Sequence, residues 1–230
     1  MMRKVVVVLG ASKGIGAELV SLFAKNRDLD VVALARTIEK DMLWRNNPNV
    51  FVHNFDLNSS TIHTDLQNIL SNYSNIHFLI NNAGYLVNKP FLELSRLDII
   101  ESYQVNIVGI MESLQVFIPK MMENGGHVVN ISSMGAFQGS VKFSGLSTYS
   151  SSKAALTNLT EMLAEEYKST NVKFNCLCLG AVQTEMLAKA FPGYEAPVSP
   201  LEMAEYIADF TLIQWKWING KIIPVSLSTP

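Results

Sequence analysis

The sequence has little charge, few cysteines and no long apolar run. Only 17% of its 230 residues are charged, and 18 basic residues nearly balance 20 acidic ones, so the formal net charge is −2. A chain without an excess of one sign has no general attraction to nucleic acid or to an anionic membrane. Every apolar run is far shorter than the roughly 18 residues that cross a bilayer. We therefore expect neither nucleic acid nor a membrane as a partner.

The two cysteines, Cys176 and Cys178, lie two positions apart in an apolar stretch. On a strand they would share one face, where a disulfide between them is geometrically poor. We therefore expect buried free thiols and a cytoplasmic protein. The basic start of the chain leads into residues 5–9, an apolar run that is too short for the core of a signal peptide. Lys13 follows soon after, so we interpret this run as the first strand.

Short apolar runs alternate with longer helical patterns along the chain, and 48% of the residues are hydrophobic. This alternation predicts an α/β fold, a doubly wound sheet of seven parallel strands flanked by helices on both faces, in a single domain over residues 1–230. One long helical stretch should break or bend near Pro119. The expected strands are 5–9, 31–35, 50–55, 76–81, 127–132, 172–179 and 221–225, and the expected helices are 15–26, 62–73, 96–122, 147–169 and 201–213.

A glycine-rich turn joins the first expected strand to the first helix. It reads Gly10-Ala11-Ser12-Lys13-Gly14-Ile15-Gly16. Glycines allow a tight turn, a close approach of phosphate to the backbone and close packing of helix on strand, and the helix N-terminus offers unpaired N–H groups to an anion. Alone, such a turn is explained equally well as purely structural. Its place between strand and helix favours dinucleotide binding.

The spacing Gly-x3-Gly-x-Gly resembles the first turn of the short-chain dehydrogenase/reductase family, although that family usually has Thr where this chain has Leu9. The resemblance extends over nearly the whole chain. It implies one NAD(P)-binding Rossmann domain and hydride transfer between a nicotinamide and a carbonyl or secondary alcohol. It also implies a homodimer or homotetramer.

The end of the second strand indicates which nicotinamide cofactor is bound. An acid at this point would bind the ribose 2′-hydroxyl of NAD, but the sequence is Leu34-Ala35-Arg36-Thr37. An Arg clamps a 2′-phosphate with two hydrogen bonds, and Lys13 adds a second positive charge. Family members with basic residues at both places generally prefer NADPH. The alternative is that Arg36 is a solvated charge, but we predict NADP(H) over NAD(H).

Tyr149 and Lys153 stand four residues apart, on one face of an expected helix. An isolated Tyr has a pKa of about 10, and a neighbouring ammonium favours the phenolate and lowers that pKa. Such a pair can give a proton to a carbonyl oxygen or take one from an alcohol. By itself the pair is a common chance occurrence, and its weight comes from the motifs around it.

The resemblance implies a role for each matching residue. Tyr149 is the acid–base, Lys153 holds the nicotinamide ribose, Ser133 (preferred over Ser132) binds the substrate oxygen, and Asn106 holds a water that completes a proton relay. Each of the last two also has a plain structural explanation, as a strand-end cap and a polar helix residue. The implied cofactor-binding residues are Gly10, Ser12, Lys13, Gly14, Ile15, Gly16, Arg36, Asp56, Leu57, Asn82, Ala83, Gly84, Tyr149, Lys153, Val182 and Thr184.

Several segments depart from the family pattern. The loop between Ser133 and Tyr149 is longer, and the segment after Thr184 is short, which suggests an open site or one completed by another subunit. The expected pocket loops carry apolar side chains and predict a modest-sized apolar carbonyl substrate: Leu86, Phe91, Met134, Phe137, Phe143 and Phe191. Trp215 and Trp217 suit a subunit interface or the core equally well.

Two further interpretations complete the sequence-based account. The four histidines, at positions 53, 63, 77 and 127, have no metal-ligand spacing and should lie at the surface or at strand ends. No metal is therefore expected. The alternative function is an NADP(H)-binding sensor or regulator with little turnover. The simultaneous presence of Tyr149, Lys153, Ser133 and Asn106 argues against it.

Overall fold

The computed structural model describes residues 3–39 and 42–228, and their centre is a seven-stranded parallel sheet. Its order is β3-β2-β1-β4-β5-β6-β7, so the sequence-based fold prediction is confirmed. None of the helices in the described ranges has the length and apolar character needed to cross a membrane. The strands are β1 (Lys4–Leu9), β2 (Leu29–Ala35), β3 (Val50–Asn54), β4 (Phe78–Asn81), β5 (Gly126–Ser133), β6 (Val172–Leu179) and β7 (Lys221–Val225).

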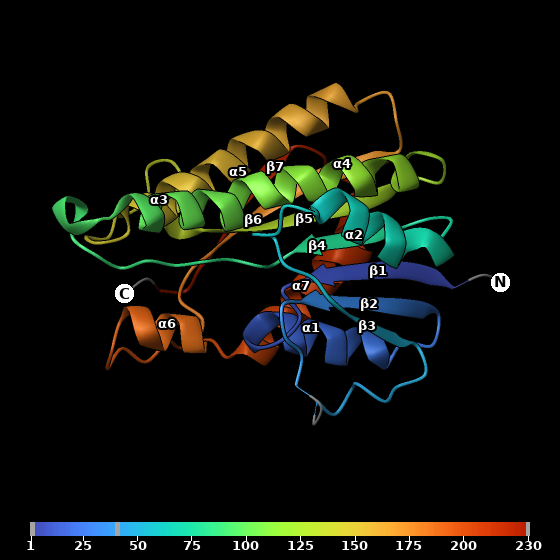
Figure 1. Ribbon diagram of the computed structural model, residues 1–230, viewed down its shortest axis with the longest axis horizontal. Coiled ribbons are helices and arrows are strands. Elements are labelled where there is room, and N and C mark those ends of the chain that lie inside the picture. Colours follow the sequence, from blue (N-terminus) through green and yellow to red (C-terminus); the bar gives the residue numbers. More distant parts are fainter. Residues whose placement is uncertain (1–2, 40–41, 229–230) are drawn as a thin grey trace.

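Helices cover both faces of the sheet (Figure 1). One face packs on α1 (Gly14–Ala24) and α7 (Pro200–Leu212), and the other on α2 (Ile62–Ile69), α4 (Gly109–Met122) and α5 (Ser147–Glu166). The inner strands are continuous apolar runs because side chains on both of their faces are buried. In β1, Val6 and Val8 join the core under α1, and Val7 and Leu9 join the core on the opposite face.

The strand order reverses between β1 and β4, where the chain crosses from one half of the sheet to the other. In open parallel sheets this reversal leaves a crevice beyond the carboxyl ends of the strands, and ligands bind there. Leu9 and Asn81 pair at the ends of these two strands. The glycine turn after β1 and the segment after β4 therefore flank the same crevice.

The long helical stretch is interrupted at a different place from the one predicted. It consists of α3 (Arg96–Tyr103), a π-helical turn (Gln104–Val108) and α4, which continues through Pro119 to Met122. The predicted break near Pro119 is therefore wrong. The irregularity falls at Asn106, whose side chain bonds both backbone groups of Tyr85. Inserted π turns of this kind occur mostly at functional sites.

The structure shows whether His127 and the two C-terminal tryptophans are buried or exposed, which the sequence left open. His127 is the second residue of β5 and is completely buried, so the expected position at a strand end is correct for this histidine and the expected surface exposure is wrong. Its Nδ1–H donates to the Thr211 carbonyl at 3.1 Å, and Nε2 accepts from Asn175 at 3.0 Å. Trp215 packs edge-on against Phe78 in the core, whereas Trp217 is 78% exposed.

Burial of His127 predicts a loss of stability in mild acid. Desolvation lowers the pKa of His127 from 6.5 to about 4, so the unfolded chain binds a proton that the folded protein excludes. The stabilisation is complete above pH 6.5 and is lost as the pH falls towards 4. Between pH 7 and pH 5, urea unfolding should show a loss of about 2 kcal/mol from this residue.

The matched variants for this prediction are His127→Gln and His63→Gln. The first removes the titrating group, so its stability should change less between pH 7 and pH 5 than that of the wild type. His63 is exposed, and its variant should keep the wild-type pH dependence. An unchanged pH dependence in His127→Gln would contradict the assignment.

Candidate active site

The glycine turn has a backbone that larger residues cannot adopt. Gly10 has φ +84°, and a Cβ on it would lie 2.7 Å from the backbone of Ala83. A Cβ on Gly16 would lie only 1.9 Å from the Gly10 carbonyl oxygen, because α1 packs directly on the turn. Asn82 Nδ2 donates to that same oxygen at 2.9 Å. The turn and the end of β4 are thus locked together at the crevice.

The N-terminus of α1 is open to an anion. Its N-cap residue, Lys13, makes no side-chain cap, and no acidic residue lies in the first turn. The unpaired N–H groups and the positive end of the helix dipole therefore face the crevice, as phosphate binding requires. This cradle suits the pyrophosphate of a dinucleotide. Ser12 and Ile15 belong to the same turn, and Ile15 also lines the pocket described below.

The residues predicted to bind the adenosine end lie after β2 and β3. Arg36 follows β2 directly and is exposed. Asp56 follows β3 and its carboxylate accepts the N–H of Asn58 at 3.0 Å, so it already has a structural role. Leu57 is buried and its carbonyl accepts a hydrogen bond from Gln104 Nε2 at 3.3 Å. Parallel strands bring these positions to the same edge as the glycine turn.

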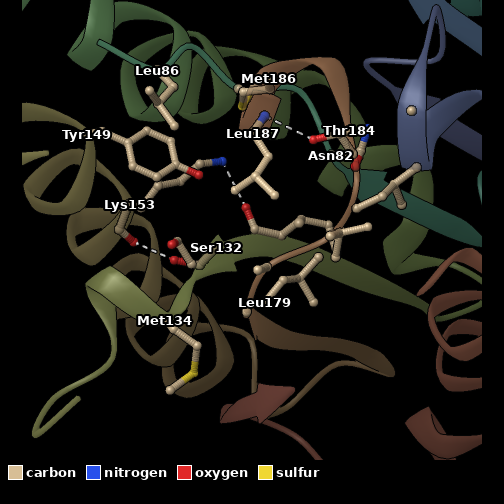
Figure 2. A pocket seen from close by; sticks show the side chains of 18 of the residues that line it. Asn82, Leu86, Ser132, Met134, Tyr149, Lys153, Leu179, Thr184, Met186 and Leu187 are labelled. Carbon is tan, nitrogen blue, oxygen red and sulfur yellow. Dashed lines mark hydrogen bonds between the residues drawn. The ribbon is translucent and has the colours of Figure 1, made fainter. Parts of the chain in front are cut away.

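Tyr149 and Lys153 project from the start of α5 into the pocket (Figure 2). Lys153 is almost completely buried, and its Nζ donates to the Ile131 carbonyl at 2.8 Å and to the Ala83 carbonyl at 3.4 Å. A Cβ on Gly84 would lie 3.4 Å from the same Nζ. The ammonium is therefore held between the ends of β4 and β5, beside the crevice.

Burial sets the protonation behaviour of this pair. Desolvation lowers the pKa of Lys153 to about 8, close to physiological pH. Desolvation also raises the pKa of Tyr149 to about 12, and a hydrogen bond from Ser133 opposes this rise only in part. The expected lowering by Lys153 is therefore not seen, because the ammonium is directed to backbone carbonyls. The neutral phenol is a proton donor under all ordinary conditions.

The two serines at the end of β5 have different environments. Ser132 Oγ donates to the Lys153 carbonyl at 3.0 Å and is buried, which ties α5 to the sheet. Ser133 Oγ accepts the N–H of Gly135 at 3.2 Å and lies beside the Tyr149 hydroxyl. The Ser133 hydroxyl is directed to the Tyr149 hydroxyl in the pocket, whereas the Ser132 hydroxyl donates to the Lys153 carbonyl. The geometry favours Ser133 as the group that would contact a substrate oxygen.

Asn106 is buried and its side-chain amide is fully used within the protein. Oδ1 accepts the N–H of Tyr85 at 2.8 Å, and Nδ2 donates to the Tyr85 carbonyl at 2.8 Å and to Ser152 Oγ at 2.9 Å. These bonds fix the segment after β4 against the π turn and α5. The side-chain amide is therefore a positioning group in this arrangement.

A row of buried polar side chains connects α5 to the sheet. Asn81 Nδ2 donates to Asn130 Oδ1 at 2.7 Å, and Asn130 Nδ2 donates to Thr160 Oγ1 at 2.8 Å. Adjacent strands β4 and β5 are thus linked to α5 through side chains as well as through the sheet. Each buried amide needs its partner, so this row fixes the height of α5 over the sheet. The sequence analysis did not predict that Asn130 and Thr160 contact each other.

The segment after β6 forms a short helix, α6 (Glu185–Ala190), that the sequence analysis did not predict. Thr184 caps it, accepting the N–H of Leu187 at 3.3 Å (Figure 2). Val182 is buried just before it. Lys13 Nζ contacts Glu185 at 2.8 Å, so α6 reaches across to the glycine turn. The short segment after Thr184 thus contains a helix that borders the site and contacts the glycine turn.

The pocket between α5, the glycine turn and α6 has a volume of about 200 Å³. Its wall is mostly apolar, and it includes Leu86, Met134, Phe143, Leu187 and Phe191. Phe91 and Phe137, also predicted for the pocket, do not line it, and Phe91 is 72% exposed. Two lysines of the surrounding loops make contacts within the protein: Lys89 with Asp98, and Lys142 with Phe137 and Ser140.

Comparison with known proteins gives consistent matches. A family model described as short chain dehydrogenase matches residues 4–195. A 3-oxoacyl-[acyl-carrier-protein] reductase FabG of Aquifex aeolicus is 31% identical, covering 97% of this chain and 96% of the relative. The structure of ElxO with NADP bound has TM-score 0.86, 24% identity and 98% coverage of both chains. A 3-ketoacyl-(acyl-carrier-protein) reductase from Brucella melitensis complexed with NADH has TM-score 0.83, 21% identity and 98% coverage of both chains.

Proposed function

The chain belongs to the short-chain dehydrogenase family, a family of oxidoreductases, and on that premise we propose that it is an NADP(H)-dependent reductase. It would transfer hydride between the nicotinamide and a carbonyl or secondary alcohol, within one NAD(P)-binding Rossmann domain. The observation that carries the proposal is the convergence of Tyr149, Ser133 and Lys153 beside an anion-ready helix N-terminus. The proposed dinucleotide would lie along the turn at Gly10 and Gly16, where the backbone leaves no room for a side chain.

Each residue has a distinct part in the proposed reduction. The nicotinamide, when bound, supplies the hydride. Ser133 and Tyr149 hold the substrate oxygen, and the Tyr149 hydroxyl gives it a proton as the carbonyl carbon is reduced. Lys153 would hold the cofactor ribose, because its ammonium lies between the ends of β4 and β5 beside the crevice. Asn106 positions the Tyr85 peptide and α5, and Thr184 and Val182 border the nicotinamide end of the crevice.

The preference for NADP(H) rests on charge at the adenosine end. Related folds bind either cofactor, since ElxO has NADP bound and the Brucella reductase is complexed with NADH. In this chain Arg36 follows β2 where an acid would repel a 2′-phosphate, and Lys13 lies in the turn. Both side chains carry the positive charge that suits a phosphate, and the pair that Lys13 makes with Glu185 is exposed, so this lysine can exchange its partner for a phosphate.

We predict that Arg36→Gln weakens NADPH binding by about tenfold to a hundredfold and leaves NADH binding nearly unchanged. The range corresponds to loss of a charge-assisted contact to phosphate. Fluorescence titration of both cofactors measures it, with Arg27→Gln, which replaces an exposed arginine between α1 and β2, as the control. Tighter binding of NADH than of NADPH by the wild type would refute the preference.

The substrate would be an apolar carbonyl compound of modest size. The pocket wall is apolar, and Lys89 and Lys142 are occupied by contacts within the protein.

Cys176 and Cys178 are free and buried, which suits a reducing compartment such as the cytoplasm. Val108 and Met111 lie exposed on one face of α4 and its preceding turn, and we propose that this face is buried in a homo-oligomer.

A further inference from the structure

Three loops that line the pocket meet at one side chain, Asn88, in the segment after β4. Its Nδ2 donates to the carbonyl of Ala190 at 2.6 Å, at the end of α6. The next residue, Lys89, donates its N–H to the Gly145 carbonyl at 3.0 Å. Gly145 has φ +83°, and a Cβ on it would lie 1.9 Å from Asn88 Oδ1. The loops after β4, β5 and β6 are thus joined at this point.

The joint matters because α6 is too short to be stable by itself. It has six residues, and isolated helices of that length are not populated in water. The last carbonyls of any helix lack partners within it. In α6 the partner of Ala190 comes from Asn88 of another loop, and Ala190 itself is buried. The position of α6 therefore depends on contacts from outside the helix.

The other contacts of α6 hold it less firmly. The ion pair between Lys13 and Glu185 joins two side chains that are 58% and 68% exposed. Exposed pairs of this kind contribute little and are screened by salt. Phe143 and Phe191 meet edge to face with 6.2 Å between ring centres. That contact joins the same two loops that Asn88 joins, and it lies at the pocket wall.

We propose that Asn88 is a positioning residue that determines substrate size. By holding Ala190 and abutting Gly145, it fixes Leu187, Phe191 and Phe143 as a rigid wall of the pocket. The wall then excludes carbonyl compounds with long apolar chains. This inference rests on the proposed reductase function, and the experiment below separates the two.

The test uses Asn88→Asp, which preserves shape but places a carboxylate opposite the Ala190 carbonyl. Hydrogen exchange of the 185–191 segment, without any substrate, should quicken about fivefold, the factor expected for loss of one ordinary hydrogen bond. Glu185→Gln should have a smaller effect. The control Lys89→Ala breaks only the neighbouring ion pair with Asp98 and should leave exchange in this segment unchanged.

The specificity readout is a series of straight-chain aldehydes of increasing length. The wild type should lose kcat/KM with length, and Asn88→Asp should flatten that decline severalfold with an unchanged Kd for NADPH. The proposal would be overturned if hydrogen exchange of residues 185–191 in Asn88→Asp were the same as in the wild type. It would also be overturned if that exchange were faster but kcat/KM declined with aldehyde length as steeply as in the wild type. If the wild type reduces no aldehyde, ketone or diketone while exchange separates the variants as expected, the reductase function fails and the hold on α6 stands.

Discussion

Replacement of Tyr149 by Phe is expected to lower kcat for carbonyl reduction by about 10²- to 10⁴-fold, the usual contribution of a positioned acid. The ring is retained, so the pocket keeps its shape, and only the hydroxyl beside Ser133 is lost. Burial raises the pKa of this hydroxyl to about 12, so the wild-type group carries its proton throughout the neutral range. NADPH oxidation followed by absorbance measures the loss.

The control for this variant is Tyr103→Phe. Tyr103 lies on α3 and donates to Ser151 Oγ at 3.0 Å, outside the pocket. The Tyr103→Phe variant should retain wild-type turnover. The Tyr149→Phe variant should bind NADPH with an affinity within about twofold of the wild type, since the ring keeps its apolar contacts when the hydroxyl is removed. Equal turnover by the wild type and Tyr149→Phe would mean that another group supplies the proton.

The second large effect is expected for Lys153→Met. The substitution removes a buried ammonium whose Nζ donates to Ile131 and Ala83 carbonyls, and it keeps most of the side-chain volume. We expect kcat to fall by about a hundredfold or more and NADPH affinity to fall about tenfold, because one positioned charge near the reacting groups is lost. The thermal midpoint should change little, because relief of the desolvation cost of the buried ammonium offsets the loss of a donor to the two carbonyls.

The pH dependence of Lys153→Met separates a catalytic role from a structural one. Desolvation lowers the pKa of Lys153 to about 8, so the wild-type ammonium is present below pH 8 and is lost above it. Wild-type reduction should therefore decline above pH 8, and the residual rate of Lys153→Met should lack that decline. Lys168→Met, an exposed lysine paired with Glu165, should keep the wild-type profile. A decline above pH 8 that persists in Lys153→Met would assign it to another group.

The features that were predictable from the sequence are local in the chain. The glycine turn follows a strand and precedes a helix within seven residues, and Tyr149 and Lys153 are one helical turn apart. Backbone geometry places such groups without knowledge of the rest of the fold. The seven parallel strands and the helices on both faces were also predictable, because alternating strands and helices allow few arrangements, whereas the order of the strands comes from the structure.

The features that were missed depend on contacts between distant segments. The irregular turn lies at Gln104–Val108 and not near Pro119, because Asn106 is bonded to the segment after β4. His127 is buried because Thr211 and Asn175 satisfy both ring nitrogens. Neither partner is close to His127 in the sequence. A polar residue in an apolar strand gave only a weak signal that a buried partner exists.

The helix α6 and its connection to Asn88 were missed for a related reason. Six residues carry too little periodicity to indicate a helix, and the stability of α6 comes from Thr184 at one end and Asn88 at the other. The shift in the pKa of Tyr149 was predicted as a lowering, but burial raises this pKa. The spacing of Tyr149 and Lys153 in the sequence does not show that the Lys153 ammonium points to the Ile131 carbonyl. Side-chain direction is decided by the carbonyls that surround it.

The most direct test of the reductase account is transfer of deuterium from NADPH labelled at nicotinamide C4. The most readily reduced member of a panel of aldehydes, ketones and diketones is incubated with the wild-type protein and the labelled cofactor, and the product is analysed by mass spectrometry. The predicted result is deuterium bound to the new carbinol carbon, formed by Tyr149→Phe about 10²- to 10⁴-fold more slowly than by the wild type. Tight binding of NADPH with no labelled alcohol from any member would contradict the account and favour a protein that binds the cofactor without turning it over.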